Sequence, residues 1–313
     1  MGRVVSVNIS VKKGTVKQPI ESAQLKENHG IEGDAHAGAW HRQISLLASE
    51  SIDKMIKLGA TGLSPGRFAE NITTEGIDIC SLPIGSRLRL GGALVEVTQI
   101  GKECHHHCEV YRQVGMCIMP TEGIFVKVLE EGQVEPGDPV EIVYRPITAA
   151  VLVASDKGHR GEREDLSGPE LKKLLEGHAL VLEIVVLPDE RGRIAEYLKK
   201  TADSGLVDLI LTSGGTGFAP RDVTPEATMD AVERLAPGIP EAMRAKSLEI
   251  TNRAMLSRAV AGIRGRTLIV NMPGSPRAVR ECMEVFLPVL EHAIKTVRGE
   301  TFECAAERPG NCK

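Results

Sequence analysis

The stretch that decides the fold of the second half of the chain reads LTSGGTGFAPRDVTP, residues 211–225. A mostly apolar run over residues 206–211 predicts a buried strand that ends at this stretch. Three glycines and three hydroxyl side chains follow within six positions, so the backbone can approach a ligand closely and its N–H groups can form a concavity for an anion. Thr224 and Pro225 then supply the N-cap and first position of a helix expected over residues 225–235.

This strand, turn and capped helix together indicate a phosphate site at the carboxyl edge of an open parallel sheet. An ordinary strand-to-helix loop is the alternative. Such a loop needs neither this density of glycine nor an adjacent cation and carboxylate, here Arg221 and Asp222.

Strands and helices alternate through the rest of this half. The alternation predicts a three-layer α/β domain with a mostly parallel sheet covered on both faces. The expected strands cover residues 148–154, 179–187, 206–211 and 266–271.

Polar residues follow each of these strands, where the ligands of such a sheet bind. Asp189 and Asp222 can hold Mg²⁺ and, through it, the phosphates of a nucleotide. Read alone, Asp189 also fits a turn residue and Asp222 a charge at a helix N-terminus. Residues 273–276 alone also fit a plain turn. The candidate ligand-binding residues are Ser155, Asp156, Ser213, Gly214, Gly215, Thr216, Gly217, Arg221, Pro273, Gly274 and Ser275.

The first half differs in character. Short strands separated by Gly, Pro and Asp turns predict a β-barrel or a folded antiparallel sheet. Composition shifts near residues 145–147, so we expect two domains, residues 1–147 and 148–313. Residues 28–38, rich in Gly, Ala and His, suit either a site loop or a solvated surface loop.

The reactive side chains of this half gather in GKECHHHC, residues 101–108, followed by Cys117. Three interpretations stay open. The loop can hold Zn²⁺, although its Cys spacing is uncommon. It can contain inert, partly buried thiols. It can present a reactive thiolate, Cys108 or Cys104, which Lys102 and the nearby imidazoles favour.

Composition excludes several classes of function. The 38 Lys and Arg residues against 42 Asp and Glu give a net charge of −4, spread evenly, so nucleic acid is not an expected partner. No apolar stretch approaches the ~20 residues of a membrane span, and no signal peptide opens the chain. Seven cysteines, an odd number, indicate free thiols in a reducing compartment, so we expect a cytoplasmic protein acting on small molecules.

The first half resembles the MOSC family, domains found in molybdenum cofactor sulfurases and related proteins. The resemblance runs over roughly residues 3–145 and rests on GIEGDAH, HRQISL and GRFAENI, at residues 30–36, 41–46 and 66–72, on the cysteine loop, and on residues 132–140. It implies a mostly-β fold that handles the molybdenum cofactor, with a cysteine that can hold sulfur or ligate molybdenum. Cys108 fits that position best, and Cys104 next.

The second half resembles the molybdopterin adenylyltransferases, the MogA and gephyrin G-domain family. The matching motifs are residues 212–217, 221–228, 254–258, 262–265 and 271–276. The resemblance implies transfer of AMP from Mg-ATP to molybdopterin. In it, Asp189 and Asp222 match essential acidic positions, and the glycine loop and Ser275 match pterin-phosphate contacts.

The same resemblance implies a homo-oligomer, a trimer, and contacts with other molybdenum cofactor proteins. A molybdopterin carrier or scaffold without turnover is the alternative function. The fusion itself suggests two steps of one pathway on one chain.

Overall fold

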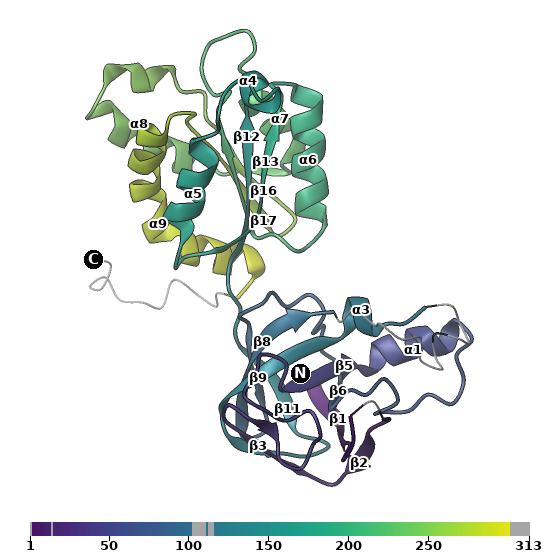
Figure 1. Cartoon of the computed structure of the whole chain (residues 1–313). Helices are drawn as coiled ribbons and strands as arrows, with labels where there is room; N and C mark the ends of the chain where they lie inside the picture. Colours follow the sequence, from purple (N-terminus) through teal and green to yellow (C-terminus); the bar gives the residue numbers. More distant parts are fainter. Residues whose placement is uncertain (1, 14, 102–110, 112–115, 301–313) are drawn as a thin grey trace. The chain divides into compact units, whose positions relative to one another are not determined.

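The computed structural model of the chain describes residues 2–13, 15–101, 111 and 116–300 (Figure 1). The chain divides into two compact units, Met1–Pro146 and Ile147–Lys313. Among the described helices, none has both the length and the apolar character that a bilayer crossing requires.

The N-terminal unit is a β-barrel, as predicted. Its sheet runs β11-β7-β8-β9-β5-β6-β1-β2, and β11 also pairs with β1, which closes the sheet on itself. Alternate strand residues point inward and fill the interior with Val, Ile and Leu. The strands are β1 (Gly2–Ile9), β2 (Gln18–Ile20), β5 (Ile44–Ala48), β6 (Ile72–Glu75), β7 (Arg87–Leu90), β8 (Ala93–Ile100), β9 (Ile124–Glu130) and β11 (Pro139–Tyr144).

Smaller elements surround this barrel. A second sheet has the order β10-β3-β4, formed by β10 (Gly132–Val134), β3 (Ala23–Lys26) and β4 (Gly30–Ile31). Two helices, α1 (Ser49–Lys57) and α3 (Met119–Glu122), pack beside β5 (Figure 1). Ile52 and Met55 of α1 share a small apolar cluster with Phe125 of β9.

The C-terminal unit is a three-layer α/β domain built on one six-stranded sheet of order β13-β12-β14-β17-β16-β15. The first four of these strands are parallel, β16 pairs antiparallel with β17, and β15 pairs antiparallel with β16. The sheet is therefore mixed, and the prediction of a mostly parallel sheet holds only for the part that carries the site loops. The strands are β12 (Thr148–Ala154), β13 (Leu180–Leu187), β14 (Leu209–Ser213), β15 (Arg234–Leu235), β16 (Ala261–Arg264) and β17 (Thr267–Met272).

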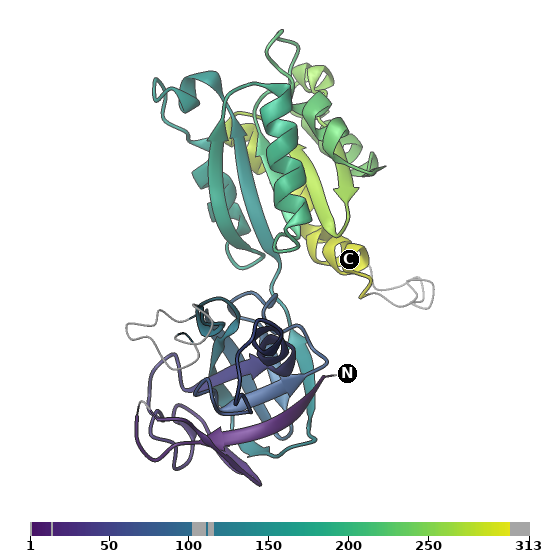
Figure 2. The same cartoon turned by 90° about the vertical axis from the view of Figure 1, so that its right-hand side faces the viewer.

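Helices cover both faces of this sheet, as Figures 1 and 2 show. Side chains along β12 alternate between the two faces. Val151 and the residues two positions before and after it pack with α5, α8 and α9, whereas Leu152 and the residues two positions before and after it pack with α6 and α7. Burial on both faces explains why β12 is apolar along nearly its whole length. The helices are α4 (Asp156–His159), α5 (Ser167–Leu175), α6 (Arg191–Asp203), α7 (Thr224–Ala231), α8 (Gly238–Leu248) and α9 (Pro276–Arg298), with a 3₁₀ turn η1 (Asn252–Leu256).

The helix expected over residues 225–235 was wrong at both ends. The helix α7 already includes Thr224, whose hydroxyl caps nothing, and it ends at Ala231. Arg234 and Leu235 instead form β15, because they pair with β16. Long-range pairing of this kind overrides the local helical preference.

A buried ion pair fixes the end of the sheet where β12 and β14 begin. The Asp208 carboxylate accepts hydrogen bonds from Thr148 N at 2.9 Å and from Arg298 Nε and Nη2 at 2.9 and 2.6 Å. Both charged side chains are at most 6% exposed. Burial opposes ionisation of Asp208, yet Arg298 and Thr148 together hold its pKa below the usual value. The pair therefore ties the last turn of α9 to the start of β14.

We predict that Arg298→Met destabilises the C-terminal unit by about 3–5 kcal/mol, because it leaves a buried carboxylate without its counter-charge. Urea unfolding at pH 7 measures the loss. The difference in unfolding free energy between wild type and variant should shrink as pH falls below 3.8, the ordinary pKa of an Asp side chain. In that range protonation of Asp208 removes the ion pair from the wild type, and the variant has no such pair to lose. Lys295→Met on the same helix removes an exposed pair with Glu291 and should destabilise the unit far less. Equal losses in the two variants would contradict the account.

Candidate functional site

Loops from three neighbouring parallel strands meet at the carboxyl edge of the C-terminal sheet. A Cβ on Gly214, after β14, would lie 2.5 Å from the carbonyl oxygen of Ala154 at the end of β12. A Cβ on Gly274, after β17, would lie 3.2 Å from Gly214 Cα. The Ser213 hydroxyl donates to the Pro273 carbonyl oxygen at 2.9 Å. Only glycine permits these approaches, and Gly214 has the left-handed φ of +90° that glycine tolerates.

A cavity of about 190 Å³ lies where these loops meet. Hydroxyl-bearing residues, glycines and the N-terminal ends of α5 and α9 border it, and helix N-termini favour an anion. The first amides of α5 already bind a carboxylate, because Ser167 N and Gly168 N donate to Asp165 Oδ1 at 2.9 and 3.1 Å. Of the predicted ligand-binding residues, four line it and Ser275 does not. Ser275 Oγ instead caps α9, accepting from Ala278 N at 3.2 Å. The lining comprises Val153, Ala154, Ser155, Gly158, Arg163, Glu164, Asp165, Leu166, Ser167, Ser213, Gly214, Gly274 and Pro276, so one cation and two carboxylates belong to it.

A charged cluster lies beside this cavity. Asp156 N donates to Asp189 Oδ2 at 2.9 Å, and Asp189 N donates to Asp156 Oδ1 at 3.1 Å. Arg221 binds the Asp156 carboxylate with two hydrogen bonds, of 2.9 Å from Nε and 2.7 Å from Nη2. Asp189 and Asp156 thus orient each other, and Arg221 fastens the loop after β14 to the end of β12.

The glycine loop lies against these carboxylates. A Cβ on Gly215 would lie 3.2 Å from Asp189 Oδ1 and 2.4 Å from Thr224 Oγ1. A Cβ on Gly217 would lie 2.8 Å from Asp222 Oδ2, which accepts from Ala219 N at 2.8 Å. The structure therefore brings both predicted acidic residues to the same loop.

Asp189 is held in an electrostatically unfavourable setting. Burial raises its pKa, and the nearby Asp156 and Asp222 carboxylates raise it further, although Asp156 N–H and Arg221 oppose this. Within the described residues, Asp189 Oδ1 and Asp222 Oδ1 accept no hydrogen bond. Two underused carboxylate oxygens in an acid-rich setting fit a divalent cation.

A cation here would not be enclosed by protein alone. Across the described ranges, no three His, Cys, Asp or Glu side chains form a group that could hold a metal. Mg²⁺ commonly binds through one or two carboxylates and completes its octahedron with water and substrate phosphates. The residues present fit that mode of binding.

Sequence reasoning missed Arg258 as a site residue. It lies just after η1, and its guanidinium donates to the carbonyl oxygens of Gly217 and Asp222 and to the Glu226 carboxylate. The motif at residues 254–258 marked the segment, but no local pattern reveals contacts that lie more than 30 positions away.

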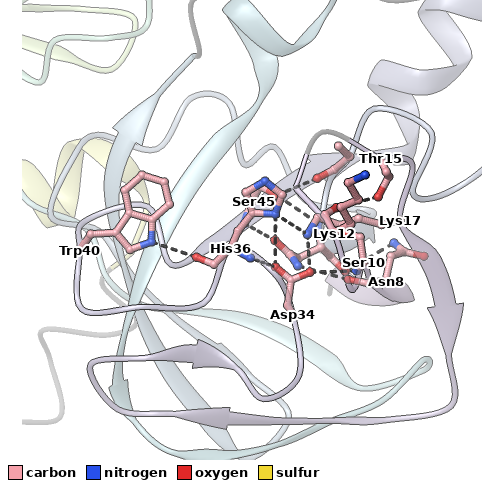
Figure 3. Close-up of polar contacts among 11 residues, drawn as sticks. Asn8, Ser10, Lys12, Thr15, Lys17, Asp34, His36, Trp40 and Ser45 are labelled. Carbon is pink, nitrogen blue, oxygen red and sulfur yellow. Dashed lines mark hydrogen bonds and ion pairs between the residues drawn. The ribbon is translucent and has the colours of Figure 1, made fainter.

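A second polar cluster lies in the N-terminal unit (Figure 3). Lys17 Nζ lies 2.5 Å from Asp34 Oδ1, and both side chains are only 1% exposed. His36 Nδ1 lies 3.3 Å from the same ammonium. Burial opposes ionisation of Asp34, but hydrogen bonds from Lys17 and from the Ser10 and His36 amides lower its pKa overall. Asp34 and His36 belong to residues 28–38, which were predicted as a site loop or a surface loop. Lys17 directly precedes β2.

A cavity of about 110 Å³ opens beside this cluster. The Arg42 guanidinium lies over the rings of Trp40 and Phe125, 4.9 and 5.7 Å from their centroids. Arg42 Nε is buried and has no hydrogen-bond partner among the described atoms. The predicted thiols Cys104 and Cys108 lie outside the described residues. The lining includes Lys17, His36, Trp40, Arg42, Ser45, Phe68, Asn71, Met119 and Phe125.

Comparison with known proteins gives two matches to protein families. The family described as "Probable molybdopterin binding domain" matches residues 150–292, and the MOSC domain matches residues 33–141. The molybdopterin adenylyltransferase of Helicobacter pylori (strain J99) is 40% identical over 156 residues, covering 49% of this chain and 89% of that protein. The molybdopterin adenylyltransferase of Haemophilus influenzae is 45% identical over 138 residues, covering 43% of this chain and 70% of that protein.

A solved structure of the molybdopterin biosynthesis enzyme MoaB from Thermus thermophilus is also similar. It shares 47% sequence identity with a TM-score of 0.47, covering 50% of this chain and 99% of that one.

We predict that Asp189→Asn stabilises the C-terminal unit at pH 7. Because folding raises the pKa of Asp189 above 3.8, the folded state binds the extra proton between 3.8 and the raised value, and wild-type stability falls as pH rises through that window. The variant lacks this loss, so its thermal midpoint at pH 7 should be higher than that of the wild type.

The gain should disappear below pH 3.8, where wild-type Asp189 is protonated. Asp203→Asn is the matched contrast, because Arg264 lowers the pKa of that exposed carboxyl and its loss should not stabilise. A thermal midpoint for Asp189→Asn that is lower than that of the wild type at pH 7 would contradict the unfavourable electrostatic setting inferred for Asp189.

Proposed function

The chain belongs to the molybdopterin adenylyltransferase family through its C-terminal unit, and we propose that this unit transfers AMP from Mg-ATP to the terminal phosphate of molybdopterin. One observation carries the proposal: consecutive glycines of one loop serve two neighbouring sites. Gly214 lines the cavity at the carboxyl edge of the sheet, and Gly215 lies against the Asp189 carboxylate. A phosphate held in the cavity would therefore lie next to a nucleotide held at the carboxylates.

In this reaction an oxygen of the pterin phosphate attacks the α-phosphorus of ATP. A new P–O bond forms there, the bond to the bridging oxygen breaks, and pyrophosphate leaves. A phosphate anion is already a nucleophile, so no side chain needs to remove a proton or to form a covalent intermediate. The protein contributes placement and neutralisation of charge.

Each site residue has a role in that placement. Ser155, Ser213 and Gly214, with Gly274 opposite, would hold the pterin phosphate. Asp189 and Asp222 would hold Mg²⁺, which when bound neutralises phosphate oxygens as charge develops on the leaving group. Arg221, more than half exposed, is available to phosphates while it orients Asp156. Thr216, Gly217, Pro273 and Ser275 shape the loops rather than line the cavity.

A carrier or scaffold that binds molybdopterin without turnover is the alternative function. It would need the cavity but not the carboxylates. The strained setting of Asp189 favours an enzyme, because a pure binding protein gains nothing from crowding three carboxylates beside its ligand.

We predict that the chain releases pyrophosphate from ATP when molybdopterin is added, and that Asp222→Ala lowers the rate by about 100-fold or more, as loss of a group that stabilises the transition state does. A coupled pyrophosphate assay measures this. Asp203→Ala, at the other end of the domain's strands, is the control and should keep the wild-type rate. Molybdopterin binding without pyrophosphate release by the wild type would establish the scaffold instead.

For the N-terminal unit we propose a role as a MOSC domain that binds the molybdenum cofactor, with Cys108 or Cys104 as the predicted sulfur or molybdenum ligand. The Arg42 cavity supports this. The Arg42 guanidinium lies over the rings of Trp40 and Phe125, and its buried Nε has no partner among the described atoms. This arrangement suits an anionic group attached to a flat ring system. For the whole chain we propose a cytoplasmic location, a homotrimer, which the resemblance of the C-terminal unit implies, and contacts with other molybdenum cofactor proteins.

We predict that molybdopterin changes the tryptophan emission of the full chain in a saturable titration. Trp40 is the only tryptophan, so the signal reports this cavity and ignores binding at the C-terminal unit. Arg42→Met should weaken the fitted affinity by about 10- to 100-fold, the value of a lost hydrogen bond to a charged group. Arg89→Met, which removes an exposed barrel cation paired with Glu130, should not change it. A flat titration, or equal affinities for both variants, would exclude this cavity as the ligand site.

A further inference from the structure

One side chain fastens the whole loop between β14 and α7. Arg258 N donates to the Thr216 carbonyl oxygen at 2.9 Å, and Arg258 Nε donates to the Gly217 carbonyl oxygen at 2.7 Å. Its Nη2 donates to the Asp222 carbonyl oxygen. The residue therefore grips both ends of the segment 216–222, which carries Asp222 and Arg221.

A carboxylate on the following helix holds Arg258 in turn. Glu226, in the first turn of α7, accepts from Arg258 Nη1, and both side chains are about one-third exposed, 30% and 33%. The second oxygen of Glu226 is buried without a partner in the described chain. Arg258 thus ties the loop to the helix that follows it, while it is itself delivered by the segment before β16.

We propose that Arg258 is a positioning residue for adenylyl transfer, which fixes the loop 216–222 so that the Asp222 carboxylate faces the reacting phosphates; this rests on the proposed function. The chain of contacts is direct. The loop sets Asp222, because Ala219 N donates to Asp222 Oδ2 at 2.8 Å and Asp222 N donates to the Ala219 carbonyl oxygen at 2.8 Å. Arg258 sets the loop, because it holds the carbonyl groups on either side of that turn.

The hydrogen bonds commit the Arg258 guanidinium to holding the loop. Each of its three nitrogens donates to a protein oxygen, which uses three of its five N–H groups. Arg221, in the same loop, differs, because it is more than half exposed and, among the described residues, pairs only with Asp156. The two arginines hold the loop from opposite sides, Arg221 toward β12 and Arg258 toward β16.

The same geometry makes a lysine a poor substitute. A planar guanidinium can reach three oxygens in different directions at once, whereas an ammonium is a point charge at the end of a flexible stem. Arg258→Lys therefore keeps the positive charge but cannot make the three hydrogen bonds that the planar guanidinium makes at once. We expect the loop to loosen without unfolding the domain.

Arg264→Lys is a matched control. Arg264 also donates to a carboxylate through two nitrogens, to Asp203 at 2.8 Å each, and to a backbone carbonyl oxygen, that of Ala231 at 3.1 Å. It lies beside Thr267, where β17 begins, and the site loops follow the other end of that strand.

The first test needs no substrate. Hydrogen–deuterium exchange of the full chain should show faster exchange across residues 216–222 in Arg258→Lys than in wild type, and no change there in Arg264→Lys. The thermal midpoints of the two variants should be similar. Unchanged exchange in the loop would overturn the proposal, as would loosening spread equally over the whole domain.

The second test measures pyrophosphate release. Arg258→Lys should lower kcat by about 10- to 100-fold, as a misplacement of order 1 Å does. KM for molybdopterin should change less than kcat, and the Mg²⁺ concentration for half-maximal rate should rise. Added guanidinium ion should restore part of the rate to Arg258→Ala.

These outcomes separate the two proposals. A wild-type chain that releases no pyrophosphate would refute the adenylyltransferase function, and the exchange experiment would still decide whether Arg258 holds the loop. An active wild type with unchanged kcat in Arg258→Lys, or with no rescue by guanidinium, would refute the positioning role alone.

Discussion

The site depends on how closely three parallel strands bring their loops together. At Gly214 the backbone lies so near the Ala154 carbonyl oxygen that one added carbon would overlap it, and Gly274 approaches Gly214 from the other side. Parallel strands force this convergence, because their carboxyl ends lie at one edge of the sheet. Glycines at Gly214 and Gly274 then let the backbone come close to the cavity that results.

The two ends of this sheet differ in how their buried carboxylates are paired. Where β14 begins, Asp208 is enclosed and fully paired with Arg298 and Thr148, so its carboxylate supports the fold. Where the parallel strands end, Asp189 lies among other carboxylates, and burial raises its pKa. The unfavourable electrostatics at that edge persist because apolar cores on both faces of the sheet hold the strands in place. A site with underpaired carboxylates attracts cations, and the paired edge does not.

The parts predicted well from sequence were those set by local pattern. Buried parallel strands can be recognised in the sequence as apolar runs. The residues that follow these runs, including Asp189 and Asp222, do lie together at one edge of the sheet. Of the predicted ligand-binding residues, Ser155, Ser213, Gly214 and Gly274 line the cavity, and the next residue after Gly214, Gly215, lies against the Asp189 carboxylate. Ser275, predicted as a ligand-binding residue, caps α9 in the structure, and its role toward a ligand stays a prediction.

The features that the sequence concealed all depend on distant partners. The strands β15 and β16 are short and gain their structure from each other and from β17. Arg258 matters because of three oxygens in another segment. In the barrel, the motif that contains Arg42 was apparent, but the stacking of its guanidinium on Trp40 and Phe125 joins elements more than 80 residues apart. Periodicity and turn chemistry carry no information about such contacts.

The most direct measurement follows the α-phosphate of ATP. The full chain is incubated with molybdopterin, Mg²⁺ and ATP radiolabelled in its α-phosphate, and the products are separated. The account predicts that the label appears in a pterin product whose mass is that of adenylylated molybdopterin. Label recovered only in ATP, in free AMP or in ADP would contradict it.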